Sequence, residues 1–351
     1  MKIRIEKSTA PSDKPQGKPV FGRNFTDHMF VADYTAEKGW FDARIIPYGN
    51  LSLSPASAVL HYGQETYEGM KAYKNAAGSR FLFRPEMNAR RSNASNARMC
   101  IPQFPESDFV EAVKTLVQVD AEWIPEGRDN SLYIRPFFIA TDPYIGVAIS
   151  KSYRFIIIMS PCDAFFGTLK PVGIFVEDEY VRAVRGGTGL AKTGGNYAAS
   201  MVALARAQQN DCAQAMWLDG IERKYIEEVG TMNIFFKIDG KIITPALNES
   251  ILQGITRDSI ITLCKDFGME VEERPITIEE LVQAAENGIL QEAFGTGTAV
   301  VISPVNKLRY KNCNHTIGTG ETGETTRKLY ETLTAIQRGE AEDKHSWRME
   351  V

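Results

Sequence analysis

The stretch GGTGLAKTGGNYAAS, residues 186–200, places Lys192 between two glycine-rich runs. Glycine has no Cβ, so the backbone on both sides of this lysine can approach a flat ligand closely. A lysine amine in such a loop can form a Schiff base with a carbonyl compound, provided that its surroundings favour the uncharged amine. The pattern also fits an ordinary solvated loop lysine, so other segments have to decide between the two interpretations.

Two glycine motifs offer nucleotide-binding alternatives. GGTGLAKT, residues 186–193, resembles a phosphate-binding P-loop but has Ala191 in place of the last glycine. Two more glycines follow at once and should weaken a helix, so we expect the helix to begin near Asn196. GTGETG, residues 318–323, matches a dinucleotide-binding pattern but leaves no room for the strand and acidic residue that should follow. We interpret it as a turn into the last helix.

Composition excludes several classes of protein. The chain has 351 residues, 43% hydrophobic and 24% charged, as in a globular protein of two domains. A net charge of −4 without a basic cluster disfavours nucleic acid as a partner. Apolar stretches such as 155–159 are far shorter than the roughly 20 residues of a membrane span, and the first residues do not resemble a secretory signal, so we expect a cytoplasmic protein. Five scattered cysteines and four histidines disfavour a metal site.

The order of predicted elements indicates a mixed α/β and α+β chain with two domains. Residues 1–165 are predicted to form a smaller mixed domain with an irregular N-terminal arm. Residues 166–177 are predicted to be an inter-domain linker, and 178–351 a larger domain that binds the cofactor. Predicted helices follow Pro85 and span 106–123, 197–209, 257–267 (capped by Thr256) and 325–337, and Thr277 with Glu280 forms a capping box before another.

A pyridoxal phosphate enzyme needs, besides the lysine, an anion at the pyridine nitrogen, a donor to the ring hydroxyl and a cradle for the phosphate. Candidates for all three occur in segments that resemble those of branched-chain amino-acid aminotransferases. The segments are AKTGGNYAAS (191–200), IEEVGTMNIFF (226–236), LQGITRDSI (252–260), FGTGTAVVISPV (294–305), LHYGQETYEGMKAY (60–73) and SLYIRPFFIA (131–140). The resemblance covers residues 25–337 and implies the two-domain architecture of fold-type-IV pyridoxal phosphate enzymes, similar to that of D-amino-acid aminotransferase.

The resemblance implies a role for each cofactor-binding position. Lys192 would form the Schiff base and move a proton between substrate and cofactor. Glu228 would pair with the pyridine nitrogen and Tyr197 would hydrogen-bond the ring oxygen. Glu227 is the alternative to Glu228, since neighbouring residues of a strand point in opposite directions. The phosphate would be bound by Arg91 and Thr298 and by the backbone of Ile255 and Thr256 at a helix N-terminus. Arg90, next to Arg91, should face elsewhere.

The resemblance also implies a substrate pocket. Its wall would consist of aromatic residues, which suit leucine, isoleucine and valine side chains but also fit plain core packing: Phe25, Tyr62, Tyr67, Tyr133 and Phe165. Arg135 would bind the additional carboxylate of glutamate. The backbone at Thr231 and Ala299 would bind the α-carboxylate.

The implied reaction is transfer of the amino group from L-leucine, L-isoleucine or L-valine to 2-oxoglutarate, which gives the branched-chain 2-oxo acid and L-glutamate. The cofactor would be pyridoxal 5'-phosphate, with no metal, and the enzyme a homodimer whose protomers share pocket residues. Alternatives are a D-amino-acid aminotransferase or an aminodeoxychorismate lyase of the same fold group. A nucleotide-binding protein that uses GGTGLAKT is a more remote alternative.

Overall fold

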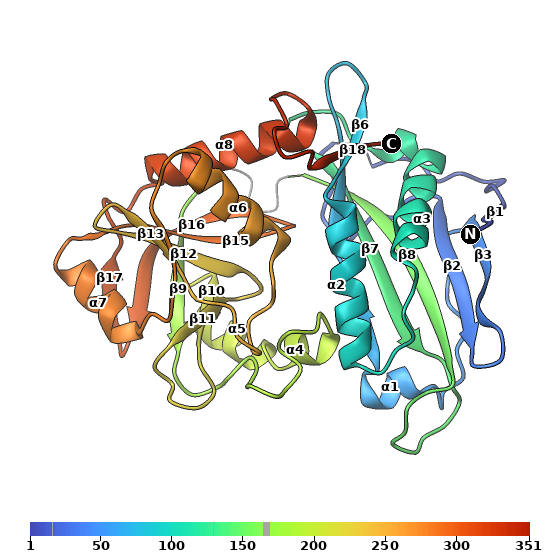
Figure 1. Cartoon of the computed structure of the whole chain (residues 1–351), viewed down its shortest axis with the longest axis horizontal. Helices are drawn as coiled ribbons and strands as arrows, with labels where there is room; N and C mark the ends of the chain where they lie inside the picture. Colours follow the sequence, from blue (N-terminus) through green and yellow to red (C-terminus); the bar gives the residue numbers. More distant parts are fainter. Residues whose placement is uncertain (16, 129, 164–168) are drawn as a thin grey trace. The chain divides into compact units, whose positions relative to one another are not determined.

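The computed structural model describes residues 1–15, 17–128, 130–163 and 169–351. The chain forms two compact units. Unit 1 comprises Met1–Phe165, Ala191–Gly194 and Ala335–Val351, and unit 2 comprises Phe166–Leu190 and Gly195–Thr334. Each unit is built around a β-sheet of its own (Figure 1).

Nine strands among the described residues form the sheet of unit 1, in the order β1-β3-β2-β8-β7-β5-β6-β18, with β4 beside β7. Neighbouring strands are antiparallel except β1 and β3. The strands are β1 (Arg4–Ile5), β2 (His28–Thr35), β3 (Gly39–Pro47), β4 (Glu65–Tyr67), β5 (Met70–Lys74), β6 (Arg80–Phe83), β7 (Ser131–Ala140), β8 (Ser152–Cys162) and β18 (Arg348–Glu350). The helices are α1 (Ala58–Tyr62), α2 (Pro85–Arg98) and α3 (Glu106–Val119), and a 3₁₀ turn spans Ala121–Trp123. Helices α2 and α3 lie side by side on one face of the sheet (Figure 1).

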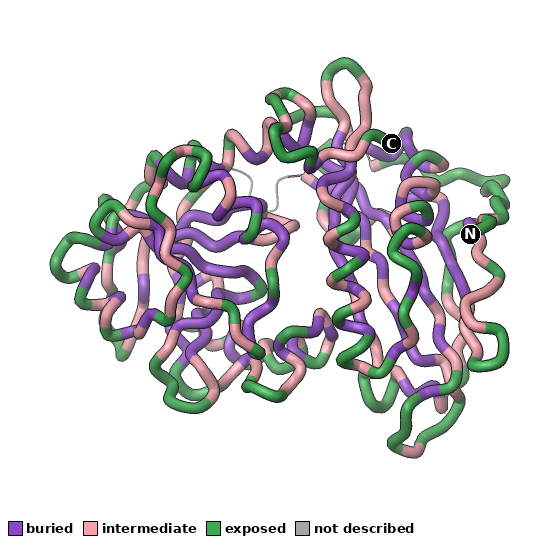
Figure 2. Tube along the Cα trace, viewed as in Figure 1, coloured by how far each residue is buried: buried purple, intermediate pink, exposed green. Residues whose placement is uncertain are grey.

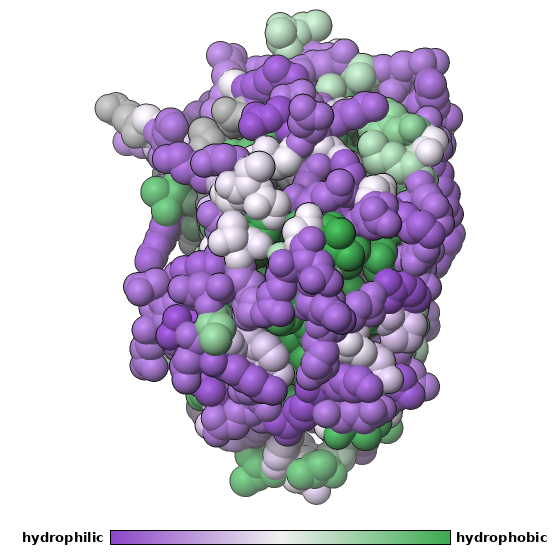
Figure 3. Space-filling view, turned by 90° about the vertical axis from the view of Figure 1, so that its left-hand side faces the viewer, coloured by the Kyte–Doolittle hydropathy of each residue, from purple (hydrophilic) through white to green (hydrophobic). Residues whose placement is uncertain are grey.

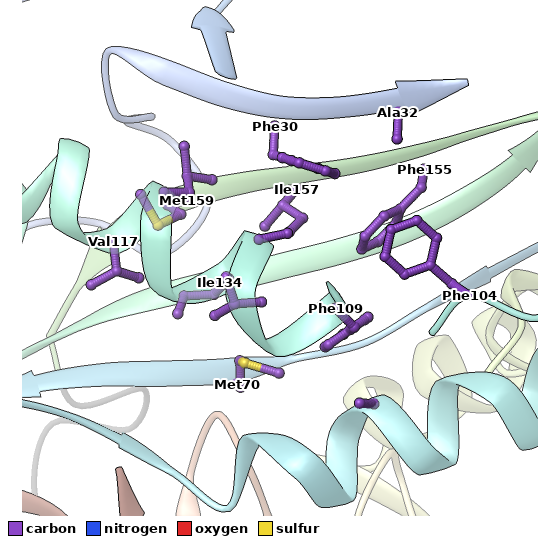
Figure 4. Packing of buried hydrophobic residues seen from close by; sticks show 14 of the residues in the cluster. Phe30, Ala32, Met70, Phe104, Phe109, Val117, Ile134, Phe155, Ile157 and Met159 are labelled. Atoms are coloured by element: carbon purple, nitrogen blue, oxygen red, sulfur yellow. The ribbon is translucent and has the colours of Figure 1, made fainter. Parts of the chain in front are cut away.

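The core of unit 1 lies on the sheet face that α3 covers. Phe155 of β8 is fully buried there, with ring centroids 4.2 Å from Phe138 and 4.7 Å from Phe104. Figure 4 shows the rings of Phe155 and Phe104 side by side. Successive side chains of a strand point to opposite faces. Because Phe138 of β7 packs in this core, Tyr133 and Arg135 of the same strand point to the other face.

Nine strands of the described residues also form the sheet of unit 2, in the order β11-β10-β9-β16-β15-β12-β13-β14, with β17 beside β16. The pairs β9–β10, β9–β16 and β13–β14 are parallel and the others antiparallel. The strands are β9 (Val172–Glu177), β10 (Gln214–Leu218), β11 (Ile226–Val229), β12 (Asn233–Ile238), β13 (Lys241–Thr244), β14 (Val271–Glu273), β15 (Leu290–Gly297), β16 (Val301–Tyr310) and β17 (Cys313–Thr316). The remaining helices are α4 (Gly194–Ala198), α5 (Met201–Gln209), α6 (Ile255–Asp266), α7 (Ile278–Glu286) and α8 (Glu324–Arg338).

The core of unit 2 joins the sheet to α7. Ile278 and Leu281 of α7 are fully buried in one cluster with Ile234 and Phe236 of β12. Within each unit, Figure 2 shows mostly buried strands connected by loops with many exposed residues. On the face drawn in Figure 3, hydrophilic residues predominate and hydrophobic ones form small separate groups. Among the residues that the structure describes, none of the helices combines the length and apolar character that spanning a bilayer requires.

Several predicted elements are confirmed. Helices α2, α3 and α8 lie where the sequence predicts them. The Thr277 hydroxyl accepts the N–H of Glu280 at 3.0 Å, so the predicted cap of α7 is present. The glycine motif at 318–323 immediately precedes α8 and is a turn, as expected.

Two helix starts differ from the prediction. Helix α4 begins at Gly194, although paired glycines disfavour a helix, and the predicted helix 197–209 is divided into α4 and α5. The Gly194 N–H donates to the Glu65 carboxylate, which stabilises this start. Thr256 does not cap α6, because the helix begins at Ile255, two residues earlier than predicted, with Gly254 as its N-cap.

The structure also differs from the predicted domain organisation. Residues 172–177 of the predicted linker form β9, inside the sheet of unit 2. Residues 191–194 and 335–351 belong to unit 1 instead of the second domain. The C-terminal segment does so because β18 pairs with β6. With these segments, unit 1 contains more of the chain than unit 2, the reverse of the predicted order of size.

Candidate active site

The segment around Lys192 is fixed by hydrogen bonds on both sides. The Lys192 N–H donates to the Ser95 hydroxyl of α2 at 2.9 Å, and its carbonyl accepts the N–H of Tyr67 at 2.9 Å. The Thr193 hydroxyl donates to the Glu65 carbonyl at 2.8 Å. Although glycines surround it, this lysine is therefore held by a helix and a strand of unit 1, which a solvated loop lysine would not be.

The Lys192 side chain lies against an aromatic residue that also contacts a second cation. Its Nζ is 4.7 Å from the centre of the Tyr67 ring. The Arg135 guanidinium is 4.7 Å from the same ring and donates to the Tyr133 hydroxyl at 3.0 Å. Gly69 is required beside them, since a Cβ there would lie 2.2 Å from that hydroxyl oxygen. Unit 1 thus brings together four predicted site residues: Tyr67, Tyr133, Arg135 and Lys192.

Glu65 is a carboxylate next to this group that the sequence analysis missed. Burial raises the pKa of Glu65, although hydrogen bonds from Gly194 and Thr193 and the charges of Arg135 and Lys192 oppose the change. Its position at the start of β4 resembles that of any strand glutamate, so the sequence held no signal for it.

Arg91 and Arg90 point in different directions, as predicted. The Nε and Nη2 atoms of Arg91 each donate to one oxygen of Glu68, both at 2.8 Å. Burial opposes the ionisation of Glu68, but the charge and hydrogen bonds of Arg91 outweigh it, so the pKa of Glu68 is lowered. Arg90 is exposed and contacts the sulfur of Met87. Of the two, only Arg91 lies on the inner side of α2.

In unit 2, the two adjacent glutamates of β11 occupy different environments. Glu228 is 2% exposed; its carboxylate lies 3.0 Å from Nε of Arg182 and accepts the N–H of Leu252 at 2.8 Å. Glu227 accepts hydrogen bonds from Ser250 and Asn248, and burial raises its pKa. The ion pair favours the charged carboxylate at Glu228, as a partner for a protonated ring nitrogen requires.

Asn233, which the sequence analysis missed, links Glu228 to the start of α6. Its Nδ2 lies 3.4 Å from the Glu228 carboxylate and donates to the Leu252 carbonyl at 2.9 Å. A Cβ on Gly254 would lie only 1.9 Å from its Oδ1, so this position needs glycine. Helix α6 then begins at Ile255 without a side-chain cap. The predicted phosphate donors Ile255 and Thr256 are thus the first two residues of a helix.

Three other predicted residues lie at the same end of the unit 2 sheet. Thr231 lies in the turn between β11 and β12, and Thr298 and Ala299 lie in the turn between β15 and β16. Asn233, at the start of β12, pairs with Thr296, near the end of β15. The two turns therefore lie at the same end of the sheet. Tyr197 lies in α4, where its carbonyl accepts the Ser200 hydroxyl at 2.6 Å.

Two predicted wall residues of unit 1 contact neighbours other than this group, and one is not described. The ring of Phe25 stacks on Tyr48 at 4.9 Å between centroids. Tyr62 is 41% exposed on α1, and its hydroxyl donates to the Ile145 carbonyl. Phe165 lies outside the described residues. Phe21, which the sequence analysis did not select, packs edge-on against Tyr133 at 4.8 Å.

The donor chemistry fits an anionic aromatic aldehyde better than a metal. The site residues offer an amine over an aromatic ring, a buried ion-paired carboxylate and the uncapped N-terminus of a helix, where a phosphate binds readily. Within the described parts of the chain, no three His, Cys, Asp or Glu residues are placed to hold a metal ion. The residues therefore fit pyridoxal phosphate in kind.

Comparison with known proteins identifies the family. Residues 65–308 match the amino-transferase class IV model. A branched-chain-amino-acid aminotransferase of Bacillus subtilis (strain 168) is 55% identical over 99% of this chain and 97% of its own. The Escherichia coli branched-chain amino acid aminotransferase has a similar structure, with a TM-score of 0.77, 27% identity, and coverage of 92% of this chain and 98% of that one. The branched-chain aminotransferase of the archaeon Thermoproteus uzoniensis, solved with norvaline, gives a TM-score of 0.77, 25% identity, and coverage of 92% and 99%. The predicted fold-type-IV fold is confirmed, and the chain belongs to the class IV aminotransferase family, among its branched-chain amino-acid aminotransferases.

Proposed function

We propose that this aminotransferase moves the amino group of L-leucine, L-isoleucine or L-valine to 2-oxoglutarate, giving the branched-chain 2-oxo acid and L-glutamate. The name and 55% identity of the Bacillus subtilis relative support this activity. Class IV aminotransferases use pyridoxal 5'-phosphate, so this is the cofactor. The observation that carries the proposal is the anchored Lys192, whose amine lies on the Tyr67 ring that Arg135 also contacts.

When bound, pyridoxal phosphate supplies an aldehyde for the amino group and a ring that takes up the electron pair left at the substrate α-carbon. Lys192 would hold the cofactor covalently, and its Nζ would then carry the proton to and from the α-carbon. The backbone hydrogen bonds of Lys192 to Ser95 and Tyr67 keep the amine within reach in both roles. Glu228, paired with Arg182, would hold the proton on the ring nitrogen, and Tyr197 would donate to the ring oxygen.

Arg91, Thr298 and the first N–H groups of α6, at Ile255 and Thr256, would bind the phosphate, because positive charge and backbone donors both favour an anion there. The backbone at Thr231 and Ala299 would bind the α-carboxylate of every substrate.

The pocket must accept both an aliphatic and a carboxylate side chain. Tyr67 and Tyr133 present apolar ring faces, while Arg135 on the same sheet face provides a cation for the second carboxylate of glutamate. Phe25, Tyr62 and Phe165 would complete the apolar wall.

We also propose that the enzyme is a cytoplasmic homodimer, without a membrane or nucleic acid as partner, and that its protomers share pocket residues. The segment after Asp142 supports self-association, because its hydrophobic side chains are unusually exposed: Tyr144 56%, Ile145 65%, Val147 88% and Ile149 64%. Free thiols at all five cysteines fit a reducing compartment. Sedimentation velocity on the purified protein tests the dimer.

Parallel assays of L-leucine and D-alanine, each with 2-oxoglutarate, test the substrate proposal. We expect glutamate to form with L-leucine, L-isoleucine and L-valine and at most in traces with D-alanine. Faster turnover of D-alanine would contradict it. Magnesium ATP should not bind, although the helix start at Gly194 removes one of the arguments against a P-loop.

A further inference from the structure

Glu68 is the most completely buried carboxylate in the Lys192 region. Its side chain is 0% exposed, and four hydrogen bonds converge on it. Oε1 accepts from Nε of Arg91, and Oε2 accepts from Nη2 of Arg91, from Nδ2 of Asn88 at 2.8 Å and from the Gly69 N–H at 3.1 Å. Burying a carboxylate is unfavourable unless such partners offset its loss of hydration, so this arrangement needs an explanation.

One face of α2 holds both Glu68 and Lys192. Asn88, Arg91 and Ser95 are spaced three and four residues apart, which places them on the same side of the helix. Asn88 and Arg91 donate to Glu68, whereas Ser95 accepts the backbone N–H of Lys192. Ser95 thus holds the Lys192 backbone on the helix face that binds Glu68, and the charge of Lys192 contributes to lowering the pKa of Glu68. A change in the position of the Arg91 guanidinium would therefore occur beside the cofactor-bearing lysine.

We propose that Glu68 is a positioning residue that orients the Arg91 guanidinium toward the cofactor phosphate. This inference rests on the proposed function. A guanidinium carries five N–H donors in one plane, and the fork with Glu68 fixes that plane through Nε and Nη2. The N–H groups of the guanidinium that do not bind Glu68 then point away from that carboxylate. Because Glu68 neutralises Arg91, the pair binds an anion through directed hydrogen bonds more than through net charge.

Glutamine at position 68 is expected to break the fork, although it has nearly the same shape. Every contact to the carboxylate comes from a donor, so the amide NH₂ would face N–H groups on whichever side it lies. Lysine at position 91 would keep the positive charge beside Glu68 but could not form the planar fork. Glu68→Gln and Arg91→Lys thus remove orientation in two independent ways.

The experiment measures the dissociation constants of pyridoxal phosphate and of pyridoxal, which lacks the phosphate, for apo forms of the enzyme. The forms compared are wild type, Glu68→Gln, Arg91→Lys, Arg91→Met and the double variant Glu68→Gln/Arg91→Met. We expect the dissociation constant of pyridoxal phosphate to rise about ten- to a hundredfold in Glu68→Gln and in Arg91→Lys. The dissociation constant of pyridoxal should change less than about threefold. In the Arg91→Met background, Glu68→Gln should add little, because its effect passes through Arg91.

Glu292→Gln is the matched control, since Glu292 is a buried carboxylate that binds Thr325 and Thr326 in unit 2. It should lower stability without changing either dissociation constant.

Equal losses of affinity for the two ligands in Glu68→Gln would overturn the inference. Wild-type affinity in Arg91→Lys, or a full additional loss in the double variant, would overturn it as well. If wild type itself binds no pyridoxal phosphate, the proposed function fails instead. If Glu68→Gln does not fold, Arg91→Lys and Arg91→Met decide the question alone.

Discussion

The two units offer different kinds of ligand groups. Unit 1 would contribute charged and aromatic side chains from strands, from α2 and from the 191–194 segment: Tyr67, Arg91, Tyr133, Arg135 and Lys192. Of the proposed contacts, unit 2 would contribute the buried carboxylate of Glu228, the side chains of Tyr197 and Thr298, and backbone at a helix start and at two turns. Side-chain substitutions should therefore impair unit 1 throughout, but unit 2 chiefly at Glu228 and Tyr197. The backbone contacts of unit 2 should respond only when an N–H group itself is removed.

Lys192→Ala is expected to have the largest effect. The variant loses the amine that binds the cofactor and moves the proton, so turnover of L-leucine should fall about 10⁴-fold or more. The long-wavelength absorbance of the purified protein should disappear as well. Lys265→Ala, at an exposed lysine of α6, is the control and should behave as wild type. Substantial activity in Lys192→Ala would refute the assignment.

Glu228→Gln should slow turnover about a hundredfold, since an amide cannot hold a proton on the ring nitrogen. It should also lower stability, because Arg182 is left as a buried cation without its carboxylate. Glu227→Gln should change turnover less than about threefold. Its carboxylate accepts hydrogen bonds from Ser250 and Asn248, so the substitution leaves the Glu228–Arg182 ion pair in place. Steady-state kinetics that rank the two variants in the opposite order would assign the ring contact to Glu227.

Arg135→Leu should reduce activity with glutamate much more than activity with leucine. The value of kcat/KM for glutamate should fall about a hundredfold, because a charge-assisted contact to its second carboxylate is lost. For leucine the loss should stay within about fivefold, as the apolar wall remains. Equal losses for both would mean that Arg135 serves to hold Tyr67 and Tyr133, which it contacts in the structure.

Sequence periodicity predicted the fold best where local signals are strong. The Thr277 cap and the apolar periodicity of α3 carry such signals, and the structure contains both. Strand β18 is three residues long and owes its place to pairing with β6, which no local pattern encodes. The early start of α4 depends on a carboxylate of Glu65, 129 residues away.

The site was predictable to the extent that single residues carry distinctive chemistry. The lysine between glycines could be selected from the sequence, whereas Glu228 was implied by the resemblance and Glu227 remained its alternative. Glu65, Glu68 and Asn233 were missed because their importance lies in what they contact, and polar residues of these types occur throughout the chain. Contacts between residues distant in sequence were the information that the sequence lacked.

Ile255→Pro tests whether unit 2 acts through its backbone. Proline at the first position of a helix removes an N–H group and leaves the helix intact. Gly254 already has φ −71° and ψ 126°, the extended conformation that a residue before proline needs. Ile255→Ala is the control, because it loses the same buried side chain and keeps the N–H. The affinity for pyridoxal phosphate should be about tenfold lower in Ile255→Pro than in Ile255→Ala. Equal affinities would remove Ile255 from the phosphate site.

The smallest effect concerns stability at acid pH and compares one buried carboxylate in each unit. Burial opposes the ionisation of Glu292, but hydrogen bonds from Thr326 and Thr325 at the start of α8 lower its pKa, just as Arg91 lowers that of Glu68. A lowered pKa means that the stabilisation is complete above the unfolded value of about 4.5 and is lost as the pH falls through the folded value. Glu292→Gln should therefore cost about 1–3 kcal/mol in urea unfolding at pH 7 and progressively less below pH 4.5. A cost that is independent of pH would show that Glu292 acts by shape alone. Cofactor affinity measured on the same samples should remain at the wild-type level, because Glu292 stabilises a helix while Glu68 orients a ligand contact.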